Sequence, residues 1–263
     1  MSDSRLTPVW TELKAARRTA LIPYLTAGYP TASESAAALR SSAEVADILE
    51  VGVPFSDPLA DGPTIQRSSF QALRQGMTLA GTLDLIARAE LSRPVVVFSY
   101  LNPILRYGVD RFLREAADLG IAGLLLTDLP AGIDPGIESA VGQSPLDLIR
   151  LIAPTTRPDR LAAALHGAEG FVYLVARLGV TGARATLAVD LEASVARVRQ
   201  ATSLPVAVGF GISTPEQART VGRMADGVVV GSALVDILGR DGVEVARKFL
   251  GSLRTALDAG VPA

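Results

Sequence analysis

Short apolar segments alternate with longer helical segments along almost the whole chain, and this alternation limits the choice of fold more than any other feature. Such alternation is typical of βαβ units, in which parallel strands lie buried beneath helices. Eight apolar segments are candidate strands, and they begin near Leu21, Ala46, Pro94, Ile121, Leu146, Gly170, Pro205 and Asp226. Amphipathic segments between them predict helices, among them Ser33–Val45, Arg111–Leu119, Leu191–Ala201, Pro215–Met224 and Val243–Leu257.

Chain length selects between two α/β folds. A chain of 263 residues with eight strand–helix pairs has the size of a (β/α)8 TIM barrel. The alternative is an open doubly wound sheet, whose nucleotide-binding form carries G-x-G-x-x-G after its first strand. The first candidate strand is instead followed by Thr26-Ala27-Gly28-Tyr29-Pro30. We therefore expect a TIM barrel formed as a single domain over residues 1–263, with an extra N-terminal helix. Periodicity alone leaves the open sheet as the alternative.

Composition excludes several classes of protein. A formal net charge of −2 gives no electrostatic footprint for nucleic acid. With no cysteine, the chain can form neither a disulfide nor a thiolate metal site. The segment from Met1 to Arg18 is polar and lacks the apolar core of a signal peptide, and no segment approaches the roughly 18 apolar residues of a membrane span. We expect a cytoplasmic protein.

Two strand-to-helix connections are longer than the others, Pro54–Gln66 and Arg177–Val189. Long loops in compact domains are usually functional, and in a TIM barrel they would lie at the carboxyl ends of the strands, where catalysis occurs. The second candidate strand places Glu50 on one face with Ile48 and Gly52. A lone carboxyl there would be buried, which raises its pKa toward the range useful for acid–base catalysis. The alternative is a structural Glu paired with an Arg.

The first of these loops brings two more carboxylates, Asp57 and Asp61, between prolines that restrict the chain. Asp61 is close enough in sequence to fold back over the barrel mouth and face Glu50. Both aspartates also fit ordinary turns, and that interpretation suits Asp57 better than Asp61.

Glycine-containing turns follow the seventh and eighth candidate strands, at Gly209-Phe210-Gly211 and at Gly231-Ser232. TIM barrels often bind phosphate between these two loops, through backbone amides and a helix N-terminus. Neither loop contains Lys or Arg, so binding would depend on amides and the Ser232 hydroxyl, with a further amide from Gly179-Val180-Thr181-Gly182. The alternative for Ser213-Thr214-Pro215-Glu216 is an ordinary helix N-cap.

The scarcity of lysine, histidine and cysteine limits which catalytic mechanisms the chain can use. Lys14 and Lys248, the only lysines, lie away from the strand ends, so a Schiff-base aldolase would lack its nucleophile. A single histidine, His166, and no cysteine argue against a zinc aldolase. A barrel that cleaves a carbon–carbon bond with these residues needs its electron sink in the substrate. An indole ring provides one when C3 is protonated, and carboxylates in a dry pocket suffice for such chemistry.

Two segments, Leu21–Gly28 and Glu50–Gln66, together form a recognisable pattern. They closely resemble the tryptophan synthase alpha chain family, and further matches follow in the family's order at Asn102–Leu105, Asp128–Pro130, Ala153–Thr156, Gly179–Gly182 and Gly209–Ile212. The resemblance covers nearly the whole chain. It implies retro-aldol cleavage of indole-3-glycerol phosphate to indole and D-glyceraldehyde 3-phosphate, without a metal.

The resemblance also implies residue roles. Glu50 matches the main acid/base, and Asp61 matches the carboxylate that binds the indole N–H. The positions that contact the substrate in the family match Tyr24, Ile65, Tyr100, Leu125, Tyr173 and Thr181 in this chain. Of these, Thr181 would contact Asp61 when its loop closes. Phosphate contacts fall on Gly182, Phe210, Gly211, Gly231 and Ser232. The chain departs from the usual family pattern at Tyr29, Ala131 and Ala176, away from the acid/base pair.

The family works with a separate beta chain, which carries pyridoxal phosphate and receives indole through a tunnel. The resemblance therefore implies an alpha2-beta2 heterotetramer, with contacts near Pro54–Asp57 and Asn102-Pro103, and no cofactor in this chain. The alternatives are a phosphosugar isomerase, a stand-alone indole-releasing lyase, and a non-catalytic subunit that activates a beta chain. The lack of a useful His argues against the isomerase, and the presence of Glu50 and Asp61 argues against the non-catalytic subunit.

Overall fold

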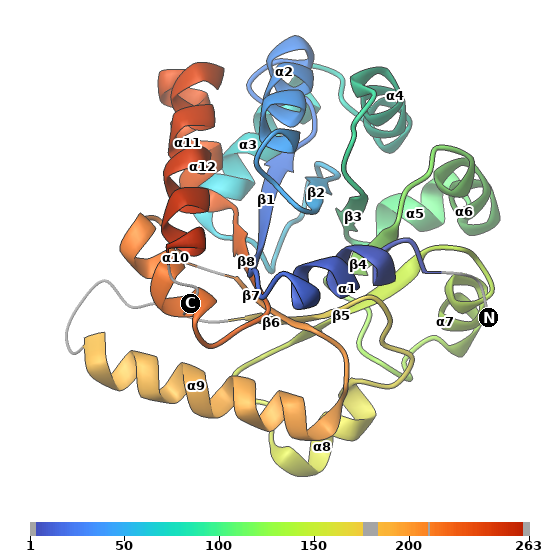
Figure 1. Cartoon of the computed structure of the whole chain (residues 1–263). Helices are drawn as coiled ribbons and strands as arrows, with labels where there is room; N and C mark the ends of the chain where they lie inside the picture. Colours follow the sequence, from blue (N-terminus) through green and yellow to red (C-terminus); the bar gives the residue numbers. More distant parts are fainter. Residues whose placement is uncertain (1–3, 176–183, 210, 260–263) are drawn as a thin grey trace.

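Eight parallel strands form a closed barrel (Figure 1). The structure is a computed structural model and describes residues 4–175, 184–209 and 211–259. Each strand pairs with its neighbours in chain order, and β1 also pairs with β8, so the sheet has no edge. This closure confirms the TIM barrel and rules out the open sheet. The strands are β1 Ala20–Thr26, β2 Leu49–Gly52, β3 Val95–Ser99, β4 Gly123–Leu126, β5 Asp147–Ile152, β6 Val172–Val175, β7 Val206–Gly209 and β8 Gly227–Val230.

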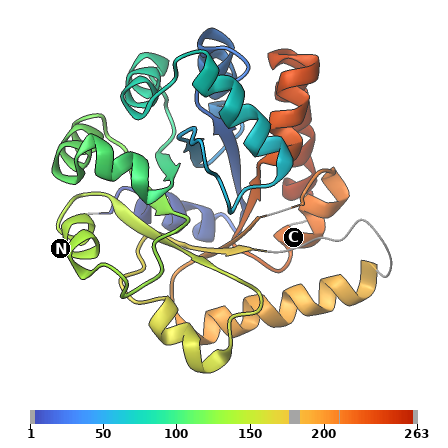
Figure 2. The same ribbon diagram turned by 180° about the vertical axis from the view of Figure 1, so that it is seen from behind.

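Helices surround the barrel on its outside (Figure 2). They are α1 Thr7–Ala15, α2 Ala32–Ala43, α3 Pro63–Arg74, α4 Leu79–Ala89, α5 Leu101–Tyr107, α6 Val109–Asp118, α7 Pro135–Gly142, α8 Pro158–Ala164, α9 Arg184–Ala201, α10 Pro215–Gly222, α11 Ser232–Asp241 and α12 Val243–Asp258. None of the helices within the described ranges is both long and apolar enough to cross a bilayer.

The extra N-terminal helix α1 covers one end of the barrel and lies in front of it in Figure 1. Its Trp10 packs 5.6 Å from the ring of Phe171, just before β6, and its ring reaches Gly227 at the start of β8. Both contacts lie at the amino ends of the strands. The α1 helix therefore closes the amino end and leaves the carboxyl end for loops.

The core has two layers, because side chains along a strand point alternately to opposite faces. In β2 and the residue before it, Ile48 packs inside the barrel, whereas Leu49 and Val51 pack between the sheet and the helices. Glu50 is fully buried on the same face as Ile48. The period of two thus correctly predicts which residues of this strand face the interior.

Several predicted boundaries are wrong. The second strand begins at Leu49 rather than near Ala46, and the fourth at Gly123 rather than near Ile121. Asp47 is held by its side chain, which accepts hydrogen bonds from the Leu21 amide at 2.9 Å and from Arg254 at 3.0 Å. Both long connections are also shorter than predicted. Because Pro63 and Arg184 already begin α3 and α9, the expected loops at 54–66 and 177–189 each end inside a helix.

Candidate active site

A cavity of about 420 Å³ opens at the carboxyl end of the barrel, opposite α1. The sequence-predicted residues that line it come from β1, β2 and β6, from the β2–α3 segment and α3, and from the turns after β7 and β8 with the start of α11. They are Tyr24, Glu50, Asp61, Ile65, Tyr173, Gly211, Gly231 and Ser232. The structure therefore brings both carboxylates and the predicted phosphate turns to one cavity.

Glu50 is a buried carboxyl without a partner among the described residues. It lies in β2, in register with Tyr24 of β1 and Val96 of β3, and its exposed fraction is 0%. Neither side-chain oxygen has a hydrogen-bond partner within the described ranges. Burial raises the pKa of Glu50 to about 8, because the low-dielectric interior disfavours the charged form. Glu50 therefore forms no structural ion pair with an Arg among the described residues.

Asp61 is held in the cavity wall by a tyrosine from another strand end. The Tyr100 hydroxyl donates to Oδ2 of Asp61 at 3.2 Å and accepts from the Ala60 amide at 2.9 Å. Burial raises the pKa of Asp61 to about 6, against the opposing effect of the Tyr100 hydrogen bond. Asp57, by contrast, is exposed and accepts a hydrogen bond from the neighbouring Ser56, as a turn residue would.

The two carboxyl groups therefore differ in their protonation. Between the pKa of Asp61, about 6, and that of Glu50, about 8, the neutral acid form dominates at Glu50 and the carboxylate dominates at Asp61. Environments that separate the pKa values of two neighbouring groups assign the acid and the anion in many active sites. The cavity can therefore supply one proton donor and one negative charge at neutral pH.

Two glycines make room for two buried tyrosine hydroxyls in the cavity. A Cβ atom at Gly52 would lie 2.0 Å from Oη of Tyr24, and one at Gly209 would lie 2.1 Å from Oη of Tyr173. Burial raises the pKa of both phenols, so both stay neutral, and the charge of Glu50 adds to the effect at Tyr173. The glycines that end β2 and β7 thus place polar groups beside Glu50.

The apolar wall contains a residue that the sequence analysis missed. Phe98 of β3 lines the cavity and meets the Tyr24 ring edge-on at 5.3 Å between centroids. The sequence could have predicted its position, since the alternation of side chains along β3 places Phe98 on the same face as Val96, toward the barrel interior. Leu125 is fully buried in the inner layer but is not part of the cavity wall. Tyr100 is also outside the wall and acts on it through Asp61.

The two helices after β7 and β8 differ in how their N-termini are capped. In α10, Thr214 and Gln217 form a capping box, and Gln217 Oε1 also accepts from the Ser213 amide at 2.8 Å. In α11, which begins at Ser232, the N-cap residue is Gly231, which has no side chain to cap the N-terminus. The first amides of a helix have no partner within the helix, so those of α11 remain to bind an anion in the cavity.

One acidic residue near the N-terminus of α11 was also missed. Asp236 of α11 lines the cavity and forms ion pairs with Arg67 at 3.5 Å and Arg240 at 3.7 Å, which offset its charge. The unusual Tyr29 packs its hydroxyl against Gly239 of the same helix. The predicted contacts Thr181, Gly182 and Phe210, and the departure at Ala176, lie outside the described residues.

Comparisons with known proteins agree on one family. A family model described as "Tryptophan synthase alpha chain" matches residues 10–256. The tryptophan synthase alpha chain of Acidiphilium cryptum is 46% identical over 89% of this chain and 87% of its own length. That of Gloeobacter violaceus is 47% identical over 90% and 87%.

Solved structures give the same result. A chain of Mycobacterium tuberculosis tryptophan synthase superposes with a TM-score of 0.88 at 42% identity, covering 97% of this chain and 98% of that one. Tryptophan synthase subunit alpha of Legionella pneumophila superposes with a TM-score of 0.89 at 33% identity, covering 97% and 99%.

Proposed function

The chain belongs to the tryptophan synthase alpha chain family, and we propose that Glu50 and Asp61 carry out the reaction of that family in this chain. The reaction is retro-aldol cleavage of indole-3-glycerol phosphate to indole and D-glyceraldehyde 3-phosphate, so the chain is a carbon–carbon lyase of L-tryptophan biosynthesis. The observation that carries the assignment of residues is the buried carboxyl of Glu50, which has no hydrogen-bond partner among the described residues and lies in the same cavity wall as Asp61.

Glu50 acts first as an acid and then as a base. Its neutral form, which its raised pKa favours, protonates C3 of the indole ring and creates a cationic ring with an electrophilic C2–N bond. The resulting carboxylate removes the proton of the side-chain hydroxyl next to C3. The bond between C3 and the glycerol chain then breaks, and its electrons return to the ring. Glu50 ends the cycle neutral, so no net proton is consumed.

Asp61 stabilises the cationic ring. Its carboxylate accepts the indole N–H hydrogen bond, which strengthens as positive charge develops on the ring. The Tyr100 hydroxyl holds the carboxylate in position, and the apolar side chains of Phe98 and Ile65 form the walls for the ring. Tyr24 and Tyr173 place neutral hydroxyls next to the glycerol chain.

The phosphate group binds at the uncapped N-terminus of α11, with Gly211 and Gly231 providing close backbone approach and Ser232 a hydroxyl. We place Thr181, Gly182 and Phe210 at the same substrate on the basis of the resemblance alone. Leu125 supports the pocket of the indole ring from behind.

No residue of the proposed mechanism in this chain requires a cofactor. In this proposal pyridoxal phosphate belongs to the beta chain.

Ser232→Ala is expected to raise KM for indole-3-glycerol phosphate about tenfold with little change in kcat. The hydroxyl contacts a phosphate that does not react, and one hydrogen bond to a charged group is worth about 1.5–3 kcal/mol. Steady-state assay of indole release, with product glyceraldehyde 3-phosphate measured in equal amount, checks both the reaction and this contact. Ser213→Ala is the matched control, because its side chain is engaged with Gln217. An unchanged KM in Ser232→Ala would place the phosphate elsewhere.

We propose that a beta chain binds around the cavity mouth, in an alpha2-beta2 heterotetramer in the cytoplasm. Large apolar side chains are exposed there. Leu59 in the β2–α3 segment is 94% exposed and Leu105 of α5 is 50% exposed, next to the segments whose sequence resembles the family's contact surface.

Addition of a beta chain is expected to stimulate indole release from a weak basal rate. Equal rates with and without it would favour a stand-alone lyase, and stimulation of the beta chain with no alpha activity would favour a non-catalytic subunit.

A further inference from the structure

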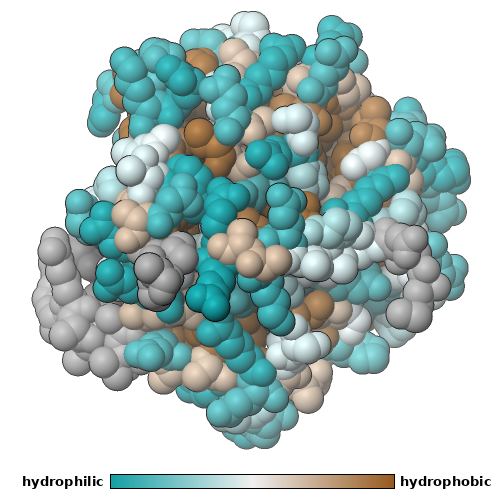
Figure 3. All heavy atoms as spheres, in the orientation of Figure 1, coloured by the Kyte–Doolittle hydropathy of each residue, from teal (hydrophilic) through white to brown (hydrophobic). Residues whose placement is uncertain are grey.

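A second, larger hollow lies at the opposite end of the barrel from the catalytic cavity. It has a volume of about 660 Å³ and lies between α1 and the segments that lead into β7 and β8, residues 202–205 and 225–226. We call it the basal crevice. Figure 3 views the molecule from this side, where hydrophilic side chains predominate around α1. Its size is within the range of small-molecule sites.

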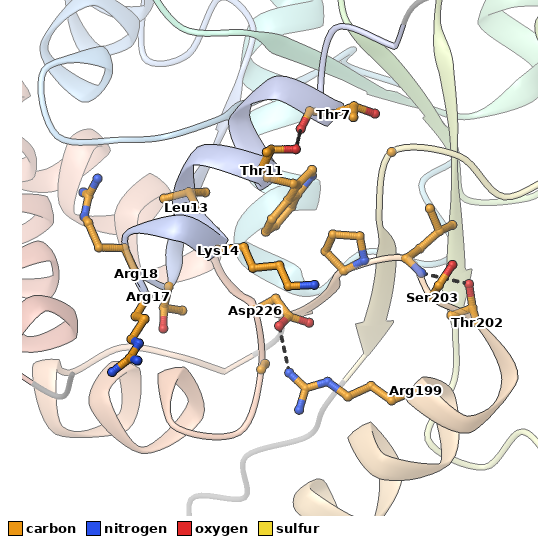
Figure 4. A pocket seen from close by; sticks show the side chains of 16 residues that line it. Thr7, Thr11, Leu13, Lys14, Arg17, Arg18, Arg199, Thr202, Ser203 and Asp226 are labelled. Carbon is orange, nitrogen blue, oxygen red and sulfur yellow. Dashed lines mark hydrogen bonds and ion pairs between the residues drawn. The ribbon is translucent and has the colours of Figure 1, made fainter. Parts of the chain in front are cut away.

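The lining of the basal crevice is cationic although the chain as a whole is acidic. Among the described residues that line it, Lys14, Arg17, Arg18 and Arg199 are basic and Asp226 alone is acidic. The formal net charge of the whole chain is −2. Figure 4 shows Lys14 reaching from α1 across the crevice, with Asp226 and Arg199 on the opposite wall. Such a concentration of one charge in a hollow focuses its potential on an oppositely charged ligand.

Ion pairs within the protein neutralise only part of this charge. Asp226 accepts from Arg199 at 2.9 Å and from the Val206 amide at 2.8 Å, so both of its oxygens are engaged. Arg18 contacts Asp47 at 3.6 Å and Asp258 at 3.5 Å.

Lys14 and Arg17 differ from these two arginines. Neither side chain has a hydrogen bond or an ion pair to any residue that the structure describes. Arg17 also has a φ of 53°, in the left-handed region that non-glycine residues seldom adopt. Arg17 points away from Lys14 at the end of α1 (Figure 4), so Lys14 is the cationic group that the crevice offers to an anion.

Hydroxyl and apolar groups complete the wall. Thr202 Oγ1 accepts from the Leu204 amide at 3.1 Å, which leaves its proton to donate, and Ser203 is exposed beside it. The half-buried Leu204 and Pro205 give an apolar surface on the same side. A dianion with three acceptor oxygens suits Lys14 and the hydroxyls, and a flat ring suits the apolar surface.

We propose that the basal crevice is a second ligand site, which binds a small phosphate monoester whose organic part is a flat apolar ring. Lys14 contacts the phosphate, and the hydroxyls of Thr202 and Ser203, on the side toward which Lys14 points (Figure 4), donate to its oxygens. The ring lies against Leu204 and Pro205. The site is independent of the catalytic cavity, which opens at the other end of the barrel.

The chain contains its own reporter for this site. Trp10 is the single tryptophan of the sequence, and it lines the basal crevice but not the catalytic cavity. Titration of the full chain with phenyl phosphate, followed by tryptophan emission, is expected to give a saturable change. Phenol at the same concentration is expected to give none, because it lacks the anion. Binding of phenyl phosphate at the catalytic cavity would leave the Trp10 signal unchanged.

Lys14→Ala is expected to raise the Kd for phenyl phosphate about tenfold, since one charge-assisted hydrogen bond is lost, and Lys14→Arg is expected to restore most of the binding. Lys248→Ala, which changes the other lysine at an exposed position of α12, is the matched control and should bind normally. Equilibrium dialysis provides a second measurement, in which Lys14→Ala must bind fewer molecules per chain at a fixed concentration. Equal responses to phenol and phenyl phosphate, or identical affinity in Lys14→Ala and Lys248→Ala by dialysis, would overturn the proposal.

Discussion

Glu50→Gln is expected to lower kcat for indole release by about a thousandfold while the protein still folds and binds substrate. Glutamine keeps the shape of the side chain but can neither give a proton to C3 nor accept one from the hydroxyl. General acid–base catalysis by one positioned group contributes about 10²–10⁴-fold, and in the proposed mechanism a single residue serves in both steps. The measurement is steady-state indole release by wild type and variant, each in complex with a beta chain.

Substrate binding provides the control for Glu50→Gln. The proposed phosphate site at α11 and the apolar wall at Phe98 are unchanged in this variant, so the Kd for indole-3-glycerol phosphate should stay within a few-fold of wild type. Folding should not suffer, because the amide replaces a buried carboxyl that has no partner among the described residues. A variant that binds substrate normally and retains most of its kcat would remove Glu50 from the mechanism.

Asp61→Asn is expected to lower kcat about a hundredfold. Asparagine keeps one oxygen toward the indole N–H but loses the negative charge that stabilises the cationic ring. Removal of one preorganised electrostatic contact in an active site typically costs about 10²–10³-fold. The same steady-state assay measures this effect.

The pH profile separates the role of Asp61 from a purely structural one. The pKa of Asp61 in the folded chain is raised to about 6, so in wild type kcat/KM should fall as the pH drops through this value and the carboxylate becomes neutral. In Asp61→Asn this acidic limb should disappear. Asp236→Asn, which removes another carboxylate of the same cavity wall, should retain it. An acidic limb that persists in Asp61→Asn would assign the titration to another group.

Much of the fold follows from local patterns in the sequence. The period of two in β2 predicts that Glu50 faces the barrel interior, and burial then explains its raised pKa without knowledge of its neighbours. The predicted strand boundaries are less accurate where side-chain hydrogen bonds take the place of backbone hydrogen bonds between strands. Asp47 is an example, since its carboxylate bonds to Leu21 and to Arg254, which is 207 residues away along the chain.

The site depends on contacts that local patterns do not contain. Asp61 reaches its position through Tyr100, 39 residues further along the chain, so sequence alone predicts a turn as readily as a catalytic carboxylate. Phe98 was missed although its strand position was readable, because its partner Tyr24 lies on a different strand. The choice between α10 and α11 as the anion site required the hydrogen bonds of Gln217, which show that one N-terminus is already capped.

The proposed mechanism requires Glu50 to be a neutral acid in the resting protein, and its protonation can be measured directly. Infrared difference spectra between wild type and Glu50→Gln, recorded across a pH titration, isolate the carbonyl band of this one carboxylic acid. We expect the band to be present at neutral pH and to be lost with a midpoint near the raised Glu50 pKa of about 8.

The sign of the linked stability change follows from the same pKa. In the unfolded chain Glu50 releases its proton near its ordinary pKa of 4.5, whereas the folded state keeps this proton up to a pH of about 8. Between these two values the wild type therefore loses stability relative to Glu50→Gln as the pH rises, by roughly 1.4 kcal/mol per pH unit.

In the infrared measurement, a protonated carbonyl band at neutral pH would support the acid role of Glu50. A carboxylate band at neutral pH, with loss of the proton near the ordinary pKa of glutamate, would contradict it.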